Sequence, residues 1–281
     1  MSERAACRLV RQPRSTQRYV PLPRLAERRL VAQMRSLALS HPRYGYRRIA
    51  ALLRAQGWTV NDKRIARLWR LEGLKLRRQQ RKRRRLGQAQ SGCARLRPQR
   101  TNHVWSVDFL MDRTENGRAL KILVVLDEWT RLCLGIVVAR SIVAADVALA
   151  LQTAIAGHGT PEHVRSDNGP EFVAKGLRRA LAVRGIEPRY IEPGSPWENG
   201  YVESFNSRLR DELLERESFS TLLEARVLIE DWRVEYNERR PHSALGYVTP
   251  AAFAAAAGSS GSASLRPTTR NESECLSPCG T

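Results

Sequence analysis

A run of mostly apolar residues at positions 121–127 (KILVVLD) most constrains the fold of this chain. A strand that is apolar on both faces has to be covered on both sides, so this run predicts a buried strand. Residues 104–111 (VWSVDFLM) alternate as a strand does, and residues 131–139 (RLCLGIVVA) form a third candidate strand. Asn116-Gly117 supplies a hairpin turn between the strands at 104–111 and 121–127. We therefore predict three consecutive antiparallel strands.

The pattern then changes to helices that alternate with short strands. Residues 144–156 and 171–183 have helical spacing, whereas 163–166 and 187–191 are short strand candidates. Three antiparallel strands followed by such an alternation are typical of a mixed α/β sheet with helices on its faces.

A further helix begins at about Glu198, after a loop bounded by prolines. Spacings of three and four predict that one stripe faces the core, made of Val202, Phe205, Leu209 and Leu213. The same spacing gives a polar stripe, made of Asn199, Glu203, Asn206 and Arg210. A carboxylate can hold a cation and a guanidinium can hold a phosphate, so this face suits a phosphate-handling site. The alternative is a surface helix with ordinary solvated charges.

Charge divides the chain near residue 100. Residues 1–100 hold 28 Lys and Arg against 4 Asp and Glu, whereas residues 101–281 hold 20 against 24. Because the excess of cations belongs to the first part, that part is expected to bind a polyanion such as nucleic acid.

The basic part contains three candidate helices after an Arg-rich, proline-broken arm at 1–23. The helices are predicted at 24–39, at 43–55, and from an Asn61 N-cap to Glu72, where Gly73 closes the last one. The third helix has an outward basic face, made of Lys63, Arg64, Arg67 and Arg70. A helix, a Gly-containing turn and a helix with a basic face indicate a helix-turn-helix that binds DNA, in a domain at 24–74. The alternative is a small bundle whose arginines only keep it in solution.

Other segments carry less information. Residues 75–100 are expected to follow phosphates as a basic linker, through Arg81, Lys82, Arg83, Arg84 and Arg85. Residues 256–281 are expected to have no fixed structure, which leaves 101–255 as the core domain. Five scattered cysteines and the absence of a long apolar run favour a reduced cytoplasmic protein outside membranes.

Three acidic residues are candidates for catalysis. Asp108 lies inside the first strand, where a carboxylate is costly unless it is paired or binds metal. Asp167 follows the fourth strand, where Asn168-Gly169 forces a turn, and Glu203 is on the later helix. The alternatives are a half-exposed strand residue for Asp108 and an ordinary turn residue for Asp167.

Three carboxylates that meet at one point repel each other unless cations lie among them. We therefore expect two Mg²⁺ ions, about 3.5–4 Å apart, with Mn²⁺ able to substitute. Other nearby acids compete for the same roles, namely Asp112, Asp127, Glu171 and Glu198. Asp127 is more simply explained by a turn, and Glu171 by the start of a helix.

The motifs WSVDF, RSDNGPEF and SPWENGYVESFNSRLRDEL together resemble the integrase-type core of retroviral integrases and bacterial insertion-sequence transposases. Asp167 and Glu203 are separated by 35 residues, which is the spacing of the Asp-Asp-Glu triad in that group. The resemblance implies a ribonuclease-H-like fold, a triad of Asp108, Asp167 and Glu203, and contact of Arg210 with the substrate end. Residues 232–253 resemble the end of these transposases, and residues 41–74 resemble their helix-turn-helix.

The resemblance is strongest to the second-reading-frame product of the insertion-sequence-three family. It implies a transposase that cuts element ends and joins a 3′-hydroxyl to target DNA, in a bacterial cytoplasm and at the nucleoid. It also implies double-stranded DNA as a partner, a homo-oligomer, and fusion to or cooperation with an upstream-frame DNA-binding protein. Two rivals stay open at this point: a nuclease of the same fold that cuts without joining, and a DNA-binding regulator derived from such an element.

Overall fold

The computed structural model describes residues 2–19, 25–75, 96–192 and 196–259. The chain forms two compact units, residues 1–77 and residues 78–281, which are described separately. Of the expected basic linker at 75–100, residues 76–95, which include 81–85, lie outside the described residues. Among the helices in the described ranges, none combines the length and the apolar character needed to cross a bilayer.

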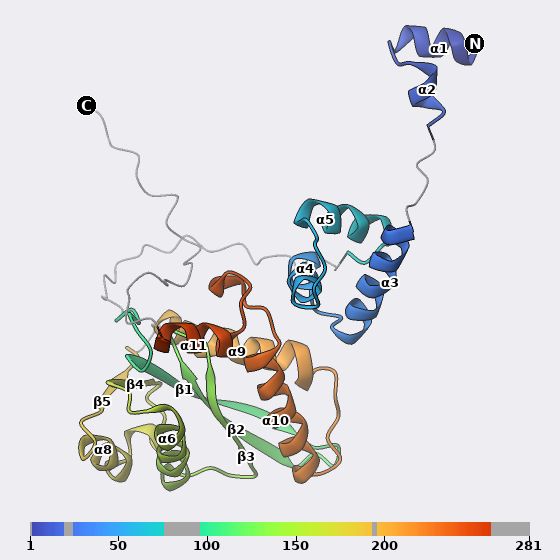
Figure 1. Ribbon diagram of the computed structural model, residues 1–281. Coiled ribbons are helices and arrows are strands. Elements are labelled where there is room, and N and C mark those ends of the chain that lie inside the picture. The colour runs from blue at the N-terminus through green and yellow to red at the C-terminus, as the bar shows by residue number, and fades with distance from the viewer. Residues whose placement is uncertain (1, 20–24, 76–95, 193–195, 260–281) are drawn as a thin grey trace, which may run out of the picture. The chain divides into compact units, whose positions relative to one another are not determined.

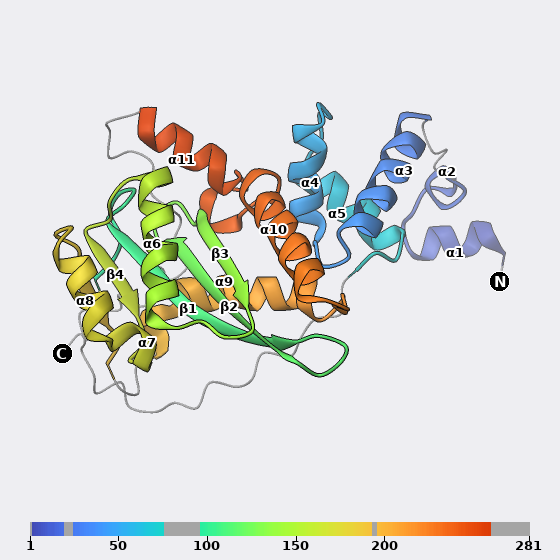
Figure 2. The same ribbon diagram turned by 90° about the horizontal axis from the view of Figure 1, so that it is seen from below.

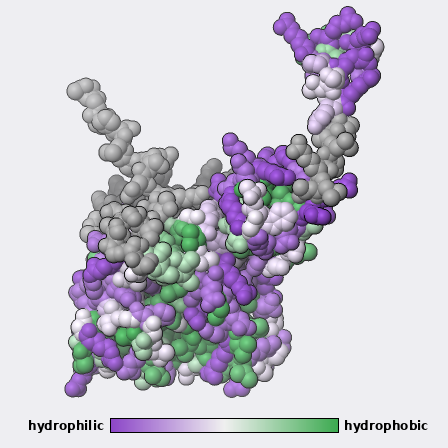
Figure 3. All heavy atoms as spheres, in the orientation of Figure 1, coloured by the Kyte–Doolittle hydropathy of each residue, from purple (hydrophilic) through white to green (hydrophobic). Residues whose placement is uncertain are grey.

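In the part of the first unit that the structure describes, all regular secondary structure is helical (Figure 1). Its helices are α1 (Glu3–Leu9), α2 (Arg14–Gln17), α3 (Leu25–Ser40), α4 (Tyr46–Ala55) and α5 (Asp62–Leu71). Helices α1 and α2 lie in the segment where prolines favour an irregular arm. Pro13 does not break a helix there because it is the N-cap of α2, and the Ser2 hydroxyl caps α1. Figure 3 shows that the visible surface of these two short helices is mostly hydrophilic.

The helix-turn-helix comprises α4, a turn and α5, as predicted. Its core is a cluster of apolar side chains that includes Leu53, Ile65 and Trp69. Gly57 ends α4 with a φ of +86°, a value that side chains other than glycine rarely adopt. The Asn61 side chain accepts a hydrogen bond of 2.9 Å from the Lys63 backbone N–H, so the predicted N-cap is confirmed.

The second unit is built on one five-stranded sheet (Figure 1). Its strands are β1 (Val104–Arg113), β2 (Ala119–Asp127), β3 (Cys133–Ala139), β4 (His163–Ser166) and β5 (Glu187–Tyr190). Their order is β3-β2-β1-β4-β5; β2 is antiparallel to β1 and β3, and β4 is parallel to β1 and β5. The mixed α/β sheet predicted from the sequence is therefore confirmed.

One face of the sheet packs against α6 (Ala144–His158), α7 (Pro170–Val173) and α8 (Lys175–Ala182) (Figure 2). The single helix expected at 171–183 is broken at Ala174, whose backbone is extended. Phe172 and Leu177 are both buried, but they are five positions apart in sequence, which places them on different sides of a continuous helix. The break allows both side chains to enter the same core.

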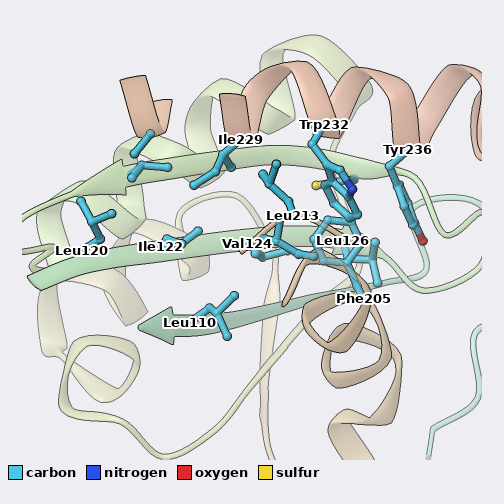
Figure 4. Packing of buried hydrophobic residues seen from close by; sticks show 14 of the residues in the cluster. Leu110, Leu120, Ile122, Val124, Leu126, Phe205, Leu213, Ile229, Trp232 and Tyr236 are labelled. Carbon is cyan, nitrogen blue, oxygen red and sulfur yellow. The ribbon is translucent and has the colours of Figure 1, made fainter. Parts of the chain in front are cut away.

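The other face packs against α9 (Gly200–Leu209), the π-helical turn η2 (Arg210–Leu214) and α10 (Leu222–Glu238). The turn η1 (Pro196–Asn199) leads into α9, and η3 (Ser243–Leu245) and α11 (Pro250–Ser259) follow α10. Figure 4 shows Phe205, Trp232 and Tyr236 meeting the apolar side chains of the sheet. The whole predicted inward stripe of α9 is buried, namely Val202, Phe205, Leu209 and Leu213. This packing fixes α9 on the sheet, next to β1 and β2.

The end of the core domain lies later than expected. Helix α11 continues to Ser259, four residues into the segment for which the composition favours no fixed structure. Its alanines are strong helix formers, and Phe253 anchors the helix by burying its ring. The remaining residues of that segment, 260–281, lie outside the described residues.

Candidate active site

The pairing of β1 with β4 aligns Asp108 with Asp167. In this parallel pair Trp105 lies opposite Val164, and Ser106 lies opposite Arg165. Two residues further along each strand come Asp108 and, just past the end of β4, Asp167. Because side chains two apart share one face of a strand, the two carboxylates lie at matching positions at the same edge of the sheet.

Asp108 has the most perturbed acidity at this edge. Burial, together with the smaller effect of the charges of Asp167 and Glu203, raises the pKa of its carboxyl to about 6, against hydrogen bonds that lower it. One of those bonds comes from Asn206 Nδ2, which donates to Asp108 Oδ2 at 2.8 Å. Asp167 and Glu203 therefore both lie within electrostatic range of Asp108, although the three come from a strand, a loop and a helix.

In the loop after β4, a backbone N–H group holds the carboxylate of Asp167. Gly169 N–H donates to Asp167 Oδ1 at 3.0 Å, and Asn168 Nδ2 donates to the carbonyl of Ile191 at 2.9 Å. A Cβ atom added at Gly169 would stand 3.0 Å from Asp167 Oδ1. Glycine is thus favoured at this position by close approach to the carboxylate and not by backbone conformation, since its φ of −57° suits any residue.

The polar stripe of α9 differs in exposure along its length. Glu203 and Arg210 are exposed, whereas Asn199 and Asn206 are buried. Asn199 Oδ1 and Asn206 Oδ1 have no hydrogen-bond partner among the described residues. Within the same residues, the Arg210 guanidinium makes no hydrogen bond or ion pair, and Arg210 begins the π-helical turn. Such turns occur frequently at functional sites.

The competing acids have other partners. Asp127 Oδ1 accepts hydrogen bonds of 2.8 Å from the backbone of Trp129 and Thr130, so it closes the turn after β2. Glu171 lies in the first turn of α7 and forms an ion pair of 2.5 Å with Lys121. These partners explain both acids without a role in catalysis.

The basic face of α5 is only partly free. Lys63, Arg67 and Arg70 are exposed, and Arg64 is half-buried. Glu27 on α3 forms ion pairs with both Arg67 and Arg64. The sequence does not reveal this pairing, because 40 residues separate Glu27 from Arg67.

A cluster of His103, Glu162 and His163 lies where β1 and β4 begin, away from the carboxylate edge. Its nitrogen and oxygen atoms are close enough together for metal ligands. However, the Gln99 backbone N–H donates to His103 Nδ1, which keeps the proton of the neutral ring on Nε2. Nε2 lies 3.7 Å from Glu162 Oε2, so the ring offers this carboxylate a proton and not a lone pair. The contacts of His103 in this cluster are thus explained by a hydrogen bond and an ion pair, without a metal.

One buried ion pair near the carboxylates was missed in the sequence. Arg165 in β4 lies against Glu128, and both side chains are almost fully buried. The available signal was a charged residue inside a four-residue strand, flanked by Val164 and Ser166. Its partner could not be identified from the sequence, because Glu128 is 37 residues away.

Comparison with known proteins agrees with this architecture. Residues 98–196 and 184–250 match two family descriptions that are both named integrase core domain, and residues 25–84 match an HTH-like domain. A chain of the simian T-cell lymphotropic virus intasome, solved in complex with the PP2A regulatory subunit B56 gamma, superposes with a TM-score of 0.50. It is 18% identical, and the match covers 65% of this chain and 63% of that one. The second unit therefore has the ribonuclease-H-like fold of integrase cores.

Two relatives show which group of integrase-core proteins this chain belongs to. An uncharacterized 31.7 kDa protein of insertion element IS407 from Burkholderia multivorans is 43% identical over 255 residues, which is 91% of each chain. The InsD transposase of insertion element IS2 from Escherichia coli is 32% identical over 222 residues, covering 74% of this chain and 72% of the relative. The chain belongs to the integrase-core transposases of bacterial insertion elements, in the insertion-sequence-three family and of the second-reading-frame type.

Proposed function

We propose that this protein is a DNA transposase that cuts insertion-element ends and joins them to target DNA with the carboxylates of Asp108, Asp167 and Glu203. In the first reaction, water attacks the phosphodiester at the element end and releases a 3′-hydroxyl. In the second, that hydroxyl attacks a target phosphodiester, forms the new P–O bond and displaces a target 3′-oxygen. The observation that carries the proposal is the register of the β1–β4 pair, which brings Asp108 and Asp167 to matching positions, with the helix of Glu203 joined to Asp108 by the Asn206 hydrogen bond.

The donor set suits a hard divalent cation. Carboxylate oxygens are the ligands that Mg²⁺ prefers, and a cation among three carboxylates would offset both the burial and the repulsion that raise the pKa of Asp108. The unpaired Asn206 Oδ1 adds a buried oxygen beside them. We propose that Asp108, Asp167 and Glu203 hold two Mg²⁺ or Mn²⁺ ions, which would stabilise the charge that develops on the attacking and leaving oxygens.

The protein's own residues keep the carboxylates in place. Asn206 fixes Asp108 by a hydrogen bond between α9 and β1, and Gly169 N–H fixes Asp167 Oδ1. Neither donor carries a formal charge, so each orients a carboxylate while leaving its charge for the cations. Orientation of this kind lowers the cost of assembling the reacting groups.

DNA is held by the basic parts of the chain in this proposal. Lys63, Arg64, Arg67 and Arg70 of α5, with residues 81–85 of the linker, supply phosphate contacts and hence affinity that depends on salt. Arg210, exposed seven residues after Glu203, contacts the DNA near the cut. Two copies act together, because two element ends have to be joined.

The test is cleavage of DNA that carries the element's terminal repeats, with Mg²⁺ present. Asp108→Asn, Asp167→Asn and Glu203→Gln should each reduce cleavage by at least about a thousandfold, on the order of 4 kcal/mol in barrier, and leave DNA binding intact. Asp112→Asn is the control, because it neutralises a carboxylate of the same strand that has its own backbone partner. Cleavage by any of the three variants near the wild-type rate would overturn the assignment.

The same assay separates the rival functions. A transposase yields nicked ends and also branched products in which the 3′-end is joined to target DNA. A nuclease of this fold yields only the nicked product, and a regulator binds the ends without cutting them. Wild-type protein that binds or cuts without joining, with paired ends and target DNA supplied, contradicts the transposase assignment.

A further inference from the structure

Behind the carboxylate edge lies an ion pair that is almost completely shielded from solvent. The Glu128 side chain is 0% exposed and the Arg165 side chain is 5% exposed. Arg165 Nη1 donates to both carboxylate oxygens of Glu128, at 2.6 and 2.7 Å. Glu128 directly follows β2, so the pair joins the end of β2 to the short strand β4.

The pair is also tied to other elements. The Ser106 hydroxyl in β1 donates to Glu128 Oε1. Arg165 Nη2 donates to the carbonyl of Leu96 at 2.6 Å, and Nη1 makes a long contact of 3.4 Å with the carbonyl of Glu198. Glu198 belongs to η1, the turn that leads directly into α9. A single carboxylate and a single guanidinium thus connect β1, β4 and the start of α9.

Residues in the ion pair and in contact with it lie a few positions before the three candidate catalytic residues in sequence. Ser106 comes two residues before Asp108, and Arg165 comes two residues before Asp167, so each pair shares one face of its strand. Ser106 and Arg165 also lie directly opposite each other in the β1–β4 pairing. Glu198 comes five residues before Glu203, where η1 passes into α9.

We infer that the Glu128–Arg165 pair is a positioning device that sets the distances among Asp108, Asp167 and Glu203. This inference rests on the proposed function, because it assumes that those three residues hold the cations. The pair contacts the segment just upstream of each carboxylate: Ser106 in β1 donates to Glu128, Arg165 itself precedes Asp167, and Arg165 makes the long contact with the Glu198 carbonyl.

Energetics support a role beyond stability. The desolvation cost of a buried ion pair is often as large as the attraction between its partners, so replacing both by apolar residues is frequently neutral for stability. Removing one partner, in contrast, strands a buried charge and costs about 3–5 kcal/mol. Replacing both Glu128 and Arg165 by apolar residues can therefore restore stability without restoring the positions of the three carboxylates. The two roles of the pair, stabilising the fold and positioning metal ligands, can thus be measured separately.

The experiment is a double-mutant cycle on the full chain, with Mn²⁺ as the probe. Glu128→Leu, Arg165→Met and the double variant are compared with wild type for Mn²⁺ affinity by calorimetry and for unfolding by denaturant. Asp108→Asn identifies the share of Mn²⁺ binding that belongs to the carboxylate edge. The matched control cycle is Glu212→Leu with Arg240→Met, an ion pair of similar burial that joins η2 to the segment after α10.

We expect both single variants to lose stability and the double variant to regain much of it. Mn²⁺ affinity should stay reduced by about tenfold or more in the double variant, since loss of groups that orient metal ligands typically costs 10–100-fold. The double variant of the control cycle should change Mn²⁺ affinity by less than about twofold. Should the double variant not fold, Ser106→Ala removes one hydrogen bond alone and should weaken Mn²⁺ binding several-fold.

The contrary outcomes are distinguishable. A folded double variant that binds Mn²⁺ as wild type does overturns the positioning role and leaves the proposed function standing, and the same result for Ser106→Ala decides the case if the double variant is unfolded. If Asp108→Asn binds Mn²⁺ as tightly as wild type, the carboxylates are not the metal site, and the proposed function fails together with this inference.

Discussion

Asn206 Nδ2 donates a hydrogen bond of 2.8 Å to Asp108 Oδ2, across 98 residues of sequence. The bond joins α9 to β1, and Asn206 is almost fully buried where it does so. It is the direct link between the helix that carries Glu203 and the strand that carries Asp108. The placement of α9 therefore bears on the position of Glu203 relative to Asp108.

Asn206→Leu removes this bond with little change in volume. We expect cleavage to fall by about 10–100-fold at limiting Mg²⁺, and by less at saturating Mg²⁺, because a misoriented ligand weakens metal binding first. Ser207→Ala is the control, since Ser207 is the next residue and is exposed. Equal losses at limiting and saturating Mg²⁺ would indicate that Asn206 does not act through the cation.

The raised pKa of Asp108 predicts a pH-dependent stability in the absence of metal. The folded value, about 6, is above the value of 3.8 for an unperturbed carboxyl, so the folded protein binds more protons than the unfolded one between these limits. Stability from this group is present below pH 4 and is lost as pH rises to about 6. Two units correspond to at most about 3 kcal/mol, reduced by partial exposure.

Asp108→Asn removes that penalty. In EDTA, the variant should have a higher free energy of unfolding than wild type at pH 7.5, by on the order of 1–2 kcal/mol, and a much smaller advantage at pH 4.5. Denaturant titration at both pH values measures this. A variant that is no more stable than wild type at pH 7.5 is incompatible with a destabilising charge at Asp108.

Gly169→Ala places a methyl group 3.0 Å from Asp167 Oδ1. We expect cleavage to drop by about tenfold or more, with a change of less than about 1 kcal/mol in stability, because the backbone conformation suits alanine. Gly176→Ala is the matched control, since it lies in α8 with open space around it and should be neutral or stabilising. Normal cleavage by Gly169→Ala would show that this loop tolerates a displaced Asp167.

The ion pairs of Glu27 make a separate prediction for DNA binding. Lys63→Ala should weaken binding uniformly across DNA sequences and reduce the slope of log affinity against log salt by about one. Glu27→Gln should act in the opposite direction, because it releases Arg67 and Arg64 from their acidic partner. Arg28→Ala is the control for Lys63→Ala, because it removes the same charge at an exposed position of α3. Fluorescence anisotropy across a salt series measures all three variants.

The sequence predicts the framework well because the framework depends on local patterns. The apolar run at 121–127 and the Asn61 N-cap both describe what a segment does alone, and both appear in the structure as predicted. The break at Ala174 could not be predicted this way, because it arises from the need to bury Phe172 and Leu177 in one core.

In the candidate site, too, some features follow from sequence patterns and others depend on tertiary contacts. Motif spacing identifies the three carboxylates as candidates, and strand pairing brings Asp108 and Asp167 to matching positions. The burial of Asn206 and the Glu128–Arg165 pair depends on tertiary contacts, 98 and 37 residues apart in sequence, for which no local pattern exists.

The central claim is that Asp108, Asp167 and Glu203 share divalent cations. Its most direct test is anomalous X-ray scattering from crystals of the protein with element-end DNA and Mn²⁺. We predict Mn²⁺ density in contact with the carboxylates of both Asp108 and Asp167, and its loss in Asp108→Asn crystals. Well-ordered carboxylates with no Mn²⁺ between them, or Mn²⁺ bound only at His103 and His163, would contradict the claim.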